Sequence, residues 1–323
     1  MGLNNEELLQ QYRKMLVTRF LENTHGKLLA EGKIQLMSHF GTGQEAVAIG
    51  IGGPLKKEDI LFGTHRGVGE YVGKGMSPQD IWCEYLGKTT GLSKGKGTLH
   101  LTDKNLNIPF VVSSLGSDWS IAVGAALATK MKGSDAVTMY FVGEGTCNQA
   151  DAHPAMNMAA VWKLPIVFAV CTNQFCEMSY YTEYYPSKDV APRAAAYGIP
   201  YEIVDGNDIE LTTEAAKRGI DHARSGKGPY LIEFKTFRMA LHFSGDPGGY
   251  VKQEDLDEWA KKDPIDLCQK KLLDRGVLSQ EEDAKLRNEV QAEIDSAVTK
   301  AMSDPDPTPE DFISDIYEQK GVL

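Results

Sequence analysis

Two short apolar runs, separated by a helix-like segment, constrain the fold more than any other feature of this sequence. Residues 136–142 read AVTMYFV, residues 166–171 read IVFAVC, and segment 152–162 between them has helical spacing. Two strands joined by a helix pair in parallel through a right-handed crossover. The sequence therefore predicts an α/β fold in which a parallel sheet is flanked by helices.

The same alternation extends along most of the chain, with a tyrosine-rich loop, SYYTEYYPS, after the second apolar run. The further segments that the pattern predicts are helices at 5–30, 44–51, 118–131, 189–197 and 210–225 and strands at 201–204 and 230–235.

The composition changes after Gly249. Residues 252–303 are rich in charged residues with helical periodicity, and three prolines between 305 and 309 end that pattern. We predict an α/β domain over residues 1–249 and a helical C-terminal region over residues 250–323, packed on the same domain.

Charge and cysteine content exclude several classes of protein. The net charge of −11 leaves no basic surplus for binding a nucleic-acid backbone. The five cysteines form no CxxC pair, so we expect neither a zinc site nor a disulfide framework, and we expect a reducing, cytoplasmic location. Because no apolar run approaches about 18 residues, we expect no membrane helix.

Polar residues follow both apolar runs. Gly-Glu-Gly at 143–145 follows the first run, and Thr-Asn-Gln-Phe at 172–175 follows the second. Ligands of parallel sheets bind at the carboxyl ends of strands, and carboxylate, amide and carbonyl oxygens suit Mg²⁺ when phosphate supplies other ligands. The N-terminus of helix 152–162 could also face an anion there. A lone GxG after a strand is more often only a tight turn, so this pattern alone leaves the ligand open.

Gly143-Glu144-Gly145, followed by Thr172-Asn173 after 26 residues, resembles the thiamine diphosphate signature GDG…NN. Other motifs at matching spacing extend the likeness along nearly the whole chain. The chain resembles the alpha subunit of the first component of 2-oxo acid dehydrogenases, which includes pyruvate, acetoin and branched-chain types. The motifs are SHFGTGQEA at 38–46, THRG at 64–67, TGLSKGKGTLHL at 90–101, KTFRMALHFSGDPG at 235–248, KDPI at 262–265 and DIY at 315–317.

The resemblance implies the thiamine diphosphate-binding fold, with Mg²⁺ held by the side chains of Glu144 and Asn173 and by the carbonyl of Phe175. It also implies a set of cofactor-binding residues on both sides of the signature. These are His65, Arg66, Ser113, Leu115, Glu144, Gly145, Thr146, Asn173 and His242.

Two histidines match catalytic positions of the family, His39 and His242, where imidazole stabilises charge or moves protons. A lone histidine is more often structural, so this assignment depends on the motifs around each one. We expect His100 to order its loop. Asp151 and His153 are two residues apart at a helix start, where capping explains the aspartate better than metal binding does.

The resemblance implies an enzyme that cleaves a 2-oxo acid or acetoin next to the carbonyl and passes the acyl group to a lipoyl-bearing partner. The glutamate that activates the cofactor belongs to a beta subunit in this family, so we expect an inactive chain alone and an α₂β₂ assembly. A split lyase or carboligase without lipoamide is the alternative. A non-catalytic relic would have lost Glu144, Asn173 and Arg66, which are all present.

Several residues depart from the family pattern near the expected site. His65 replaces the usual tyrosine, and Thr172 replaces the first asparagine of the pair. Trp119 stands where the family often continues with Gln-x-Pro, and we expect it to reshape the cofactor pocket. Leu241 and Phe243 replace a glycine and a serine beside His242, so we expect different packing in that loop.

Overall fold

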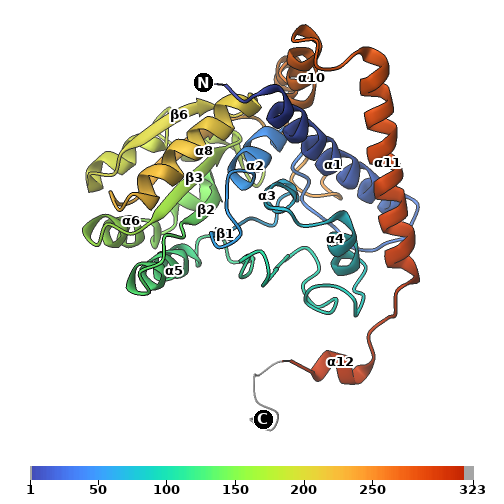
Figure 1. Cartoon of the computed structure of the whole chain (residues 1–323), viewed down its shortest axis with the longest axis horizontal. Coiled ribbons are helices and arrows are strands. Elements are labelled where there is room, and N and C mark those ends of the chain that lie inside the picture. Colours follow the sequence, from blue (N-terminus) through green and yellow to red (C-terminus); the bar gives the residue numbers. More distant parts are fainter. Residues whose placement is uncertain (1, 316–323) are drawn as a thin grey trace.

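The computed structural model describes residues 2–315, and its centre is a five-stranded sheet (Figure 1). All neighbouring strands of this sheet pair in parallel, which confirms the predicted architecture. The strands, in their spatial order, are β1 (Ile60–Phe62), β2 (Thr138–Gly143), β3 (Ile166–Thr172), β7 (Tyr230–Lys235) and β6 (Tyr201–Asp205).

The two apolar runs form the adjacent strands β2 and β3. Their register pairs Thr138 with Ile166 and Gly143 with Cys171, so both strands end at the same edge of the sheet. Both lie inside the molecule because helices cover both faces of the sheet. This register brings Glu144 and Asn173, which follow the two strand ends, to one place.

Alternate residues of the strands enter two hydrophobic cores. Met139 and Phe141 of β2 face a core that includes residues of α1, α2, α3 and α8, while Tyr140 and Val142 face a core with α5 and α6. The first group of helices is α1 (Asn5–Ala30), α2 (Glu45–Gly52), α3 (Gly69–Lys74), α4 (Pro78–Tyr85) and α8 (Ile209–Arg224). The second group is α5 (Trp119–Met131) and α6 (Ala152–Val161), with the 3₁₀ helix η2 (Ala191–Tyr197).

The C-terminal helices are α9 (Gln253–Ala260), α10 (Pro264–Asp274), α11 (Gln280–Ser303) and α12 (Pro309–Ile313). Of these helices, α11 runs along one side of the body in Figure 1, with α10 near its upper end and α12 below it. Helix α11 packs on α1 and α4 and ends before the prolines, as predicted. The division at residue 249 remains our proposal. The DIY motif at 315–317 lies outside the described residues after Asp315.

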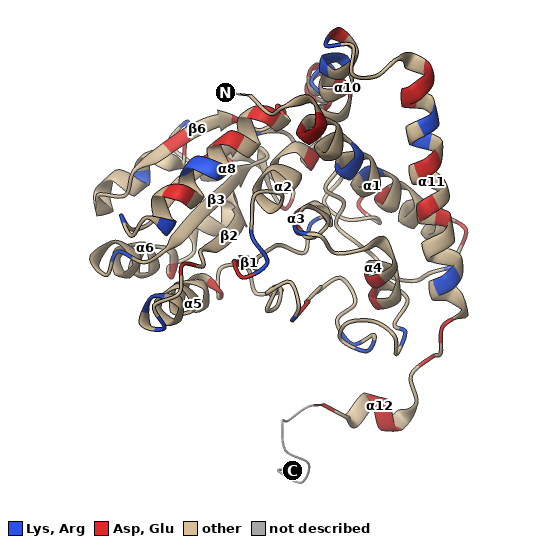
Figure 2. Cartoon of the chain, in the orientation of Figure 1, with Lys and Arg blue, Asp and Glu red and all other residues tan. Residues whose placement is uncertain are grey.

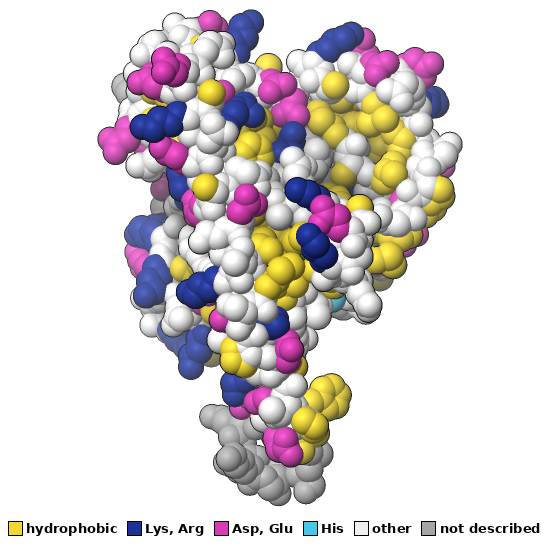
Figure 3. Space-filling view, turned by 90° about the vertical axis from the view of Figure 1, so that its right-hand side faces the viewer, with side chains coloured by type: hydrophobic (Ala, Val, Ile, Leu, Met, Phe, Trp, Pro, Cys, Tyr) yellow, Lys and Arg dark blue, Asp and Glu magenta, His cyan; other side chains and the backbone are white. Residues whose placement is uncertain are grey.

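Figures 2 and 3 show how charged and apolar side chains are distributed over the surface. In Figure 2, acidic and basic residues are mixed along α8 and α11 rather than separated by sign. Helix α12 stands apart from the body at the bottom of Figure 3, and its residues Phe312 and Ile313 are exposed. Within residues 2–315, none of the helices is long and apolar enough to cross a membrane. The five cysteines are free thiols.

The other helices and strands predicted from the sequence are confirmed to within about two residues, with one exception. The exception is the helix predicted at 189–197, which is the 3₁₀ helix η2 over residues 191–197 and ends at Gly198 with φ 66°. The sequence did not predict β1, α3, α4 and α12. It also did not predict the short elements in and before the tyrosine-rich loop, which are β4 (Phe175–Cys176), β5 (Ser179–Tyr180) and α7 (Tyr181–Tyr184).

Candidate functional site

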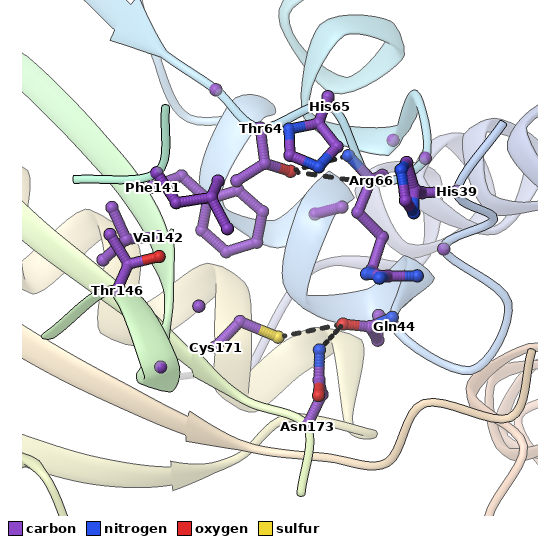
Figure 4. Close-up of a pocket in the computed structure, with 18 of the residues that line it drawn as sticks. His39, Gln44, Thr64, His65, Arg66, Phe141, Val142, Thr146, Cys171 and Asn173 are labelled. Atoms are coloured by element: carbon purple, nitrogen blue, oxygen red, sulfur yellow. Dashed lines mark hydrogen bonds between the residues drawn. The ribbon is translucent and has the colours of Figure 1, made fainter. Parts of the chain in front are cut away.

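A cavity of about 380 Å³ opens at the carboxyl ends of the central strands. Every residue that the sequence predicted for the site lines this cavity, although these residues come from six separate segments of the chain. They are His39, His65, Arg66, Ser113, Leu115, Glu144, Gly145, Thr146, Asn173, Phe175 and His242. Figure 4 shows His39, His65 and Arg66 on one side and Thr146, Cys171 and Asn173 at the strand ends. The structure thus brings the predicted set together, while the role of each residue remains a prediction.

Glu144 begins a short 3₁₀ helix (Glu144–Asn148) directly after β2. Its side chain is buried, and its Oε1 has no hydrogen-bond partner. Burial raises the pKa of Glu144 to about 7, against the lowering effect of nearby backbone N–H groups that include that of Asn173. A buried carboxylate oxygen without a hydrogen-bond partner costs free energy of folding. A cation bound beside Glu144 would reduce that cost.

Asn173 follows β3, and hydrogen bonds hold both ends of its amide. Its Nδ2 donates to Gln44 Oε1 at 3.0 Å, and its Oδ1 accepts from the backbone N–H of Phe175 at 3.1 Å (Figure 4). A carbonyl oxygen has two lone pairs, so Oδ1 keeps one for a metal ion. Gln44 is buried in turn, and its Nε2 has no partner.

Arg66 supplies the only full positive charge among the described residues that line the cavity. Its guanidinium donates to the carbonyl of His242 at 3.1 Å and to that of Phe40 at 3.4 Å. Within residues 2–315 no carboxylate lies within ion-pair distance of it, and burial lowers its pKa to about 10. A guanidinium without a counterion suits the oxygens of a phosphate group.

His39 and His242 have opposite hydrogen-bonding capacity at the ring nitrogens that remain free. His39 Nδ1 lies 2.6 Å from the carbonyl of His242, so Nδ1 carries the proton and Nε2 can accept one. His242 Nδ1 lies 3.1 Å from Arg66 NH2, which only donates, so the proton of His242 is on Nε2. The rings are 4.9 Å apart. The pair thus offers one acceptor and one donor.

Three of the histidines are uncharged at neutral pH. Burial lowers the pKa of His39, and burial lowers the pKa of His65 and His242 to about 4, with Arg66 acting in the same direction. His65 lies 4.8 Å from His39, and its Nδ1 is buried without a partner. His100 bonds the Ser113 hydroxyl at 2.6 Å through Nε2, in agreement with its expected loop-ordering role.

Buried carboxylates fix the loops that carry the histidines and Arg66. Glu22 of α1 accepts from the backbone N–H of Gly41 at 2.9 Å, and the N–H of Gly67 donates to the carbonyl of His39 at 2.7 Å. Asp246 Oδ2 accepts from the N–H of His242 at 2.8 Å and from the Tyr250 hydroxyl at 2.6 Å. These bonds set the backbone position of His39 and His242.

Apart from His65, which lines the cavity, the residues that depart from the family pattern act away from the cavity wall. Trp119 was expected to reshape the pocket, but it lies in the core against Tyr140 and donates to the carbonyl of Thr146 at 3.3 Å. Trp119 therefore supports residues 144–146 from the side of the core and does not line the cavity. Thr172 also points away and donates to buried Glu233 at 2.7 Å. Within the described residues, the cavity lining includes His242 but neither Leu241 nor Phe243.

The cavity also contains residues that the sequence did not assign, namely Glu22, Gln44, Asp118 and Glu177. Gln44 belongs to the motif GTGQEA and could have been found there. Glu22 gives no local signal, because its function depends on loops elsewhere in the chain. The lining after β2 ends at Thr146, so the expected placement of the N-terminus of α6 at the cavity is wrong for the described structure. His153 instead bonds Tyr197 at 2.6 Å.

The donor set fits a diphosphate and a divalent cation. Glu144 and Asn173 supply hard oxygen ligands, and the Oε1 of Glu144 lacks a partner. A Cβ on Gly145 would lie 2.5 Å from Cys176 Sγ, so only glycine allows the turn this close to the hairpin. No group of three or more His, Cys, Asp or Glu side chains forms a metal site within residues 2–315. In this cavity the metal ligands would be one carboxylate, that of Glu144, together with the amide oxygen of Asn173 and the carbonyl oxygen of Phe175.

Comparison with known proteins assigns this arrangement to a family. The dehydrogenase E1 component family matches residues 12–310 of the chain. The chain is 35% identical to the alpha subunit of an acetoin:2,6-dichlorophenolindophenol oxidoreductase from Bacillus subtilis, over 98% of this chain and 95% of that protein.

Two further relatives have a similar extent. The acetoin:2,6-dichlorophenolindophenol oxidoreductase alpha subunit of Cupriavidus necator is 37% identical over 98% of this chain and 95% of its own length. The pyruvate dehydrogenase E1 component alpha subunit of Rhizobium meliloti is 32% identical over 97% of this chain and 90% of its own length.

Proposed function

The chain belongs to the dehydrogenase E1 component family as an alpha subunit of a thiamine diphosphate-dependent oxidoreductase, and we propose that its cavity holds the diphosphate of that cofactor through Mg²⁺. The observation that carries the proposal is the presence, in one cavity, of two groups whose charges lack a direct counterion among the described residues. Glu144 has a buried oxygen without a partner, and Arg66 has no carboxylate partner among residues 2–315. A cation and a phosphate would satisfy both groups.

Each predicted residue has a task in this proposal. Glu144, Asn173 and the carbonyl of Phe175 bind Mg²⁺. Arg66, His65 and the N–H groups of Gly145 and Thr146 bind the diphosphate, and His242 contributes through Nδ1, which accepts from Arg66. Ser113 and Leu115 hold the aminopyrimidine ring. Held by these residues, the cofactor would supply a carbon nucleophile for a ketone carbonyl and an electron sink for carbon–carbon cleavage.

His39 and His242 serve the proton transfers around the substrate. His39 accepts a proton at Nε2, while the Nε2–H of His242 donates to an oxygen that gains negative charge. The lowered pKa of both rings supports this division, because neutral imidazole can do either task. Asp246 holds the backbone of His242 during these steps.

The partner and the substrate also belong to the proposal. The names of the relatives point to a beta subunit and to acetoin or pyruvate as substrate. We propose an α₂β₂ assembly in the cytoplasm that passes the acyl group to a lipoyl-bearing partner. The alternative of a split lyase or carboligase without lipoamide is not favoured, because the relatives are named as oxidoreductases or dehydrogenase components.

Reconstitution tests the proposal. The chain is co-expressed with its companion beta subunit, and dye-linked oxidation of acetoin and of pyruvate is measured with thiamine diphosphate and Mg²⁺. We expect oxidation of at least one substrate only when both subunits and the cofactor are present. Oxidation of neither substrate by a cofactor-loaded complex would contradict the proposal. Carboligation without dye reduction would instead support the lyase alternative.

A further inference from the structure

Carboxylates dominate the charged groups of the cavity. Among the described residues, the lining contains one guanidinium and five carboxyl groups. The guanidinium is that of Arg66, and the carboxyl groups are those of Glu22, Glu45, Asp118, Glu144 and Glu177. Burial raises the pKa of Glu22 to about 8, so Glu22 is mostly uncharged at neutral pH. If the cavity already holds a diphosphate, such a lining is poorly suited to an anionic substrate as well, unless a cation remains free to bind that substrate.

Four of the five carboxyl groups already have a partner or an assigned task. Glu45 bonds the guanidinium of Arg19, and Asp118 accepts from the Tyr140 hydroxyl at 2.7 Å. Glu22 holds the backbone of Gly41. Glu144 is the proposed Mg²⁺ ligand, and the diphosphate occupies Arg66. The remaining carboxylate is that of Glu177.

Glu177 lies at the tip of the hairpin formed by β4 and β5. It is exposed, it lines the cavity, and its φ of 52° is the left-handed conformation that two-residue hairpin turns require. Its charge acts on His39 across the cavity. Within residues 2–315 no lysine or arginine lies within ion-pair distance of Glu177. The carboxylate of Glu177 is therefore an unpaired charge on the lining of the cavity that contains the proposed catalytic histidines.

Arg66 and Arg238 also act on His39, in the direction opposite to Glu177, but Arg238 is held behind the cavity. Arg238 is fully buried, its guanidinium lies 4.7 Å from the centre of the Phe175 ring, and it donates to Tyr250 at 2.7 Å. It is not among the lining residues. His39, His65 and His242 are neutral, as argued above. Apart from Arg66, no lysine or arginine among the described residues lines the cavity to receive a substrate carboxylate.

We propose, on the premise of the function given above, that the site takes an uncharged hydroxyketone or diketone in preference to a 2-oxo acid, and that Glu177 sets this preference. A 2-oxo acid carries its carboxylate next to the reacting carbonyl. When the carbonyl reaches the site, this negative charge must enter the cavity that the carboxylate of Glu177 lines. An uncharged ketone has the same reacting group and avoids the repulsion. A repulsive element against the wrong substrate is a common basis of specificity.

Glu177→Gln tests this proposal in the complex reconstituted with the beta subunit, thiamine diphosphate and Mg²⁺. The ratio of kcat/KM for acetoin to that for pyruvate is measured by dye reduction at low and at high ionic strength. In the wild type we expect acetoin to be preferred and added salt to improve pyruvate selectively. In Glu177→Gln we expect kcat/KM for pyruvate to rise about fivefold, with the salt effect lost.

Glu183→Gln is the matched control, because Glu183 is an exposed carboxylate six residues further along that does not line the cavity. It should keep the wild-type ratio and salt dependence. A wild type that prefers pyruvate, or a ratio unchanged in Glu177→Gln, would overturn the inference and leave the proposed function standing. Turnover of neither substrate by the wild-type complex would overturn the proposed function and this inference with it.

Discussion

The two walls of the cavity are built in different ways. The strand-end wall, Glu144–Thr146 and Asn173–Phe175, follows two adjacent strands whose register fixes its geometry. The loop wall consists of His39, His65, Arg66 and His242. Its residues sit on loops that side-chain carboxylates and backbone carbonyls hold in place. The sheet therefore positions the proposed metal ligands, while a hydrogen-bond network positions the proposed proton-transfer groups.

This difference predicts different consequences of mutation. A change in the strand-end wall should alter cofactor binding directly, because the backbone there is fixed by sheet pairing on both sides. A change in the network behind the loop wall should alter turnover more than binding, because small displacements of catalytic groups reduce rate steeply. The predictions below test that contrast in order of expected effect.

The largest effect is expected for Arg66→Ala. This variant removes the only guanidinium of the described cavity lining, and charge-assisted bonds to phosphate are strong. We expect thiamine diphosphate to bind the reconstituted complex about 100-fold more weakly, which corresponds to about 2.7 kcal/mol. Isothermal calorimetry measures the Kd.

Two controls define that result. Arg66→Lys keeps the charge but loses the planar fork, so it should recover only part of the affinity. Arg218 lies on α8 and forms an ion pair with Glu202 of β6. Arg218→Ala should therefore bind thiamine diphosphate with wild-type affinity. Full affinity in Arg66→Ala would show that Arg66 does not hold the cofactor.

An intermediate effect is expected for Asp246→Asn. The amide removes one of the oxygens that accept from Gly248, His242 and Tyr250, so the loop loses part of its support. We expect kcat to fall about tenfold while the cofactor Kd changes less than about threefold. Steady-state kinetics and calorimetry on the same complex separate the two quantities. A large loss of cofactor affinity with unchanged kcat would reverse the proposed division between the walls.

The smallest effect at neutral pH is expected for His65→Asn, and it concerns how stability changes when the pH falls. The folded pKa of His65 is about 4, below its ordinary value of 6.5, so the unfolded chain binds the proton first as the pH falls. Stability from neutral His65 is therefore present above pH 6.5 and is lost progressively towards pH 4. Urea unfolding should show the wild type losing stability relative to His65→Asn in that window, by at most about 1.4 kcal/mol per pH unit.

A histidine outside the cavity provides the comparison for this measurement. His153 is exposed on α6 and does not line the cavity, so His153→Asn controls for the general effect of replacing a histidine with asparagine. Parallel curves for the wild type and His65→Asn would show that His65 is not held neutral by the fold.

The same contrast explains what could be predicted from the sequence. The strand-end wall could be found from local patterns, since two apolar runs with an intervening helix dictate a parallel pair whose ends coincide. The loop wall could not, because His39 and His242 are 203 residues apart and nothing in the local sequence brings them together. Only the family resemblance placed them in one site.

Residues behind the walls had the weakest signals. Glu22 lies within a long helix, and its buried carboxylate is explained only by the backbone of Gly41 and the neighbouring loop. Trp119 appeared as a departure near the cofactor, yet its ring fills the core against Tyr140. The roles of Glu22 and Trp119 depend on which loop or helix packs against each side chain. The periodicity of the sequence shows that a residue is buried but not what it packs against.

The most direct test of the central claim is the Mg²⁺ dependence of thiamine diphosphate binding in Glu144→Gln. The substitution keeps the size of the side chain and removes the charge that the proposed cation neutralises. In the wild-type complex we expect Mg²⁺ to strengthen cofactor binding about 100-fold relative to EDTA, and in Glu144→Gln we expect similar, weak binding in both conditions. A variant that keeps the full gain from Mg²⁺ would contradict the assignment of the strand-end wall as the metal site.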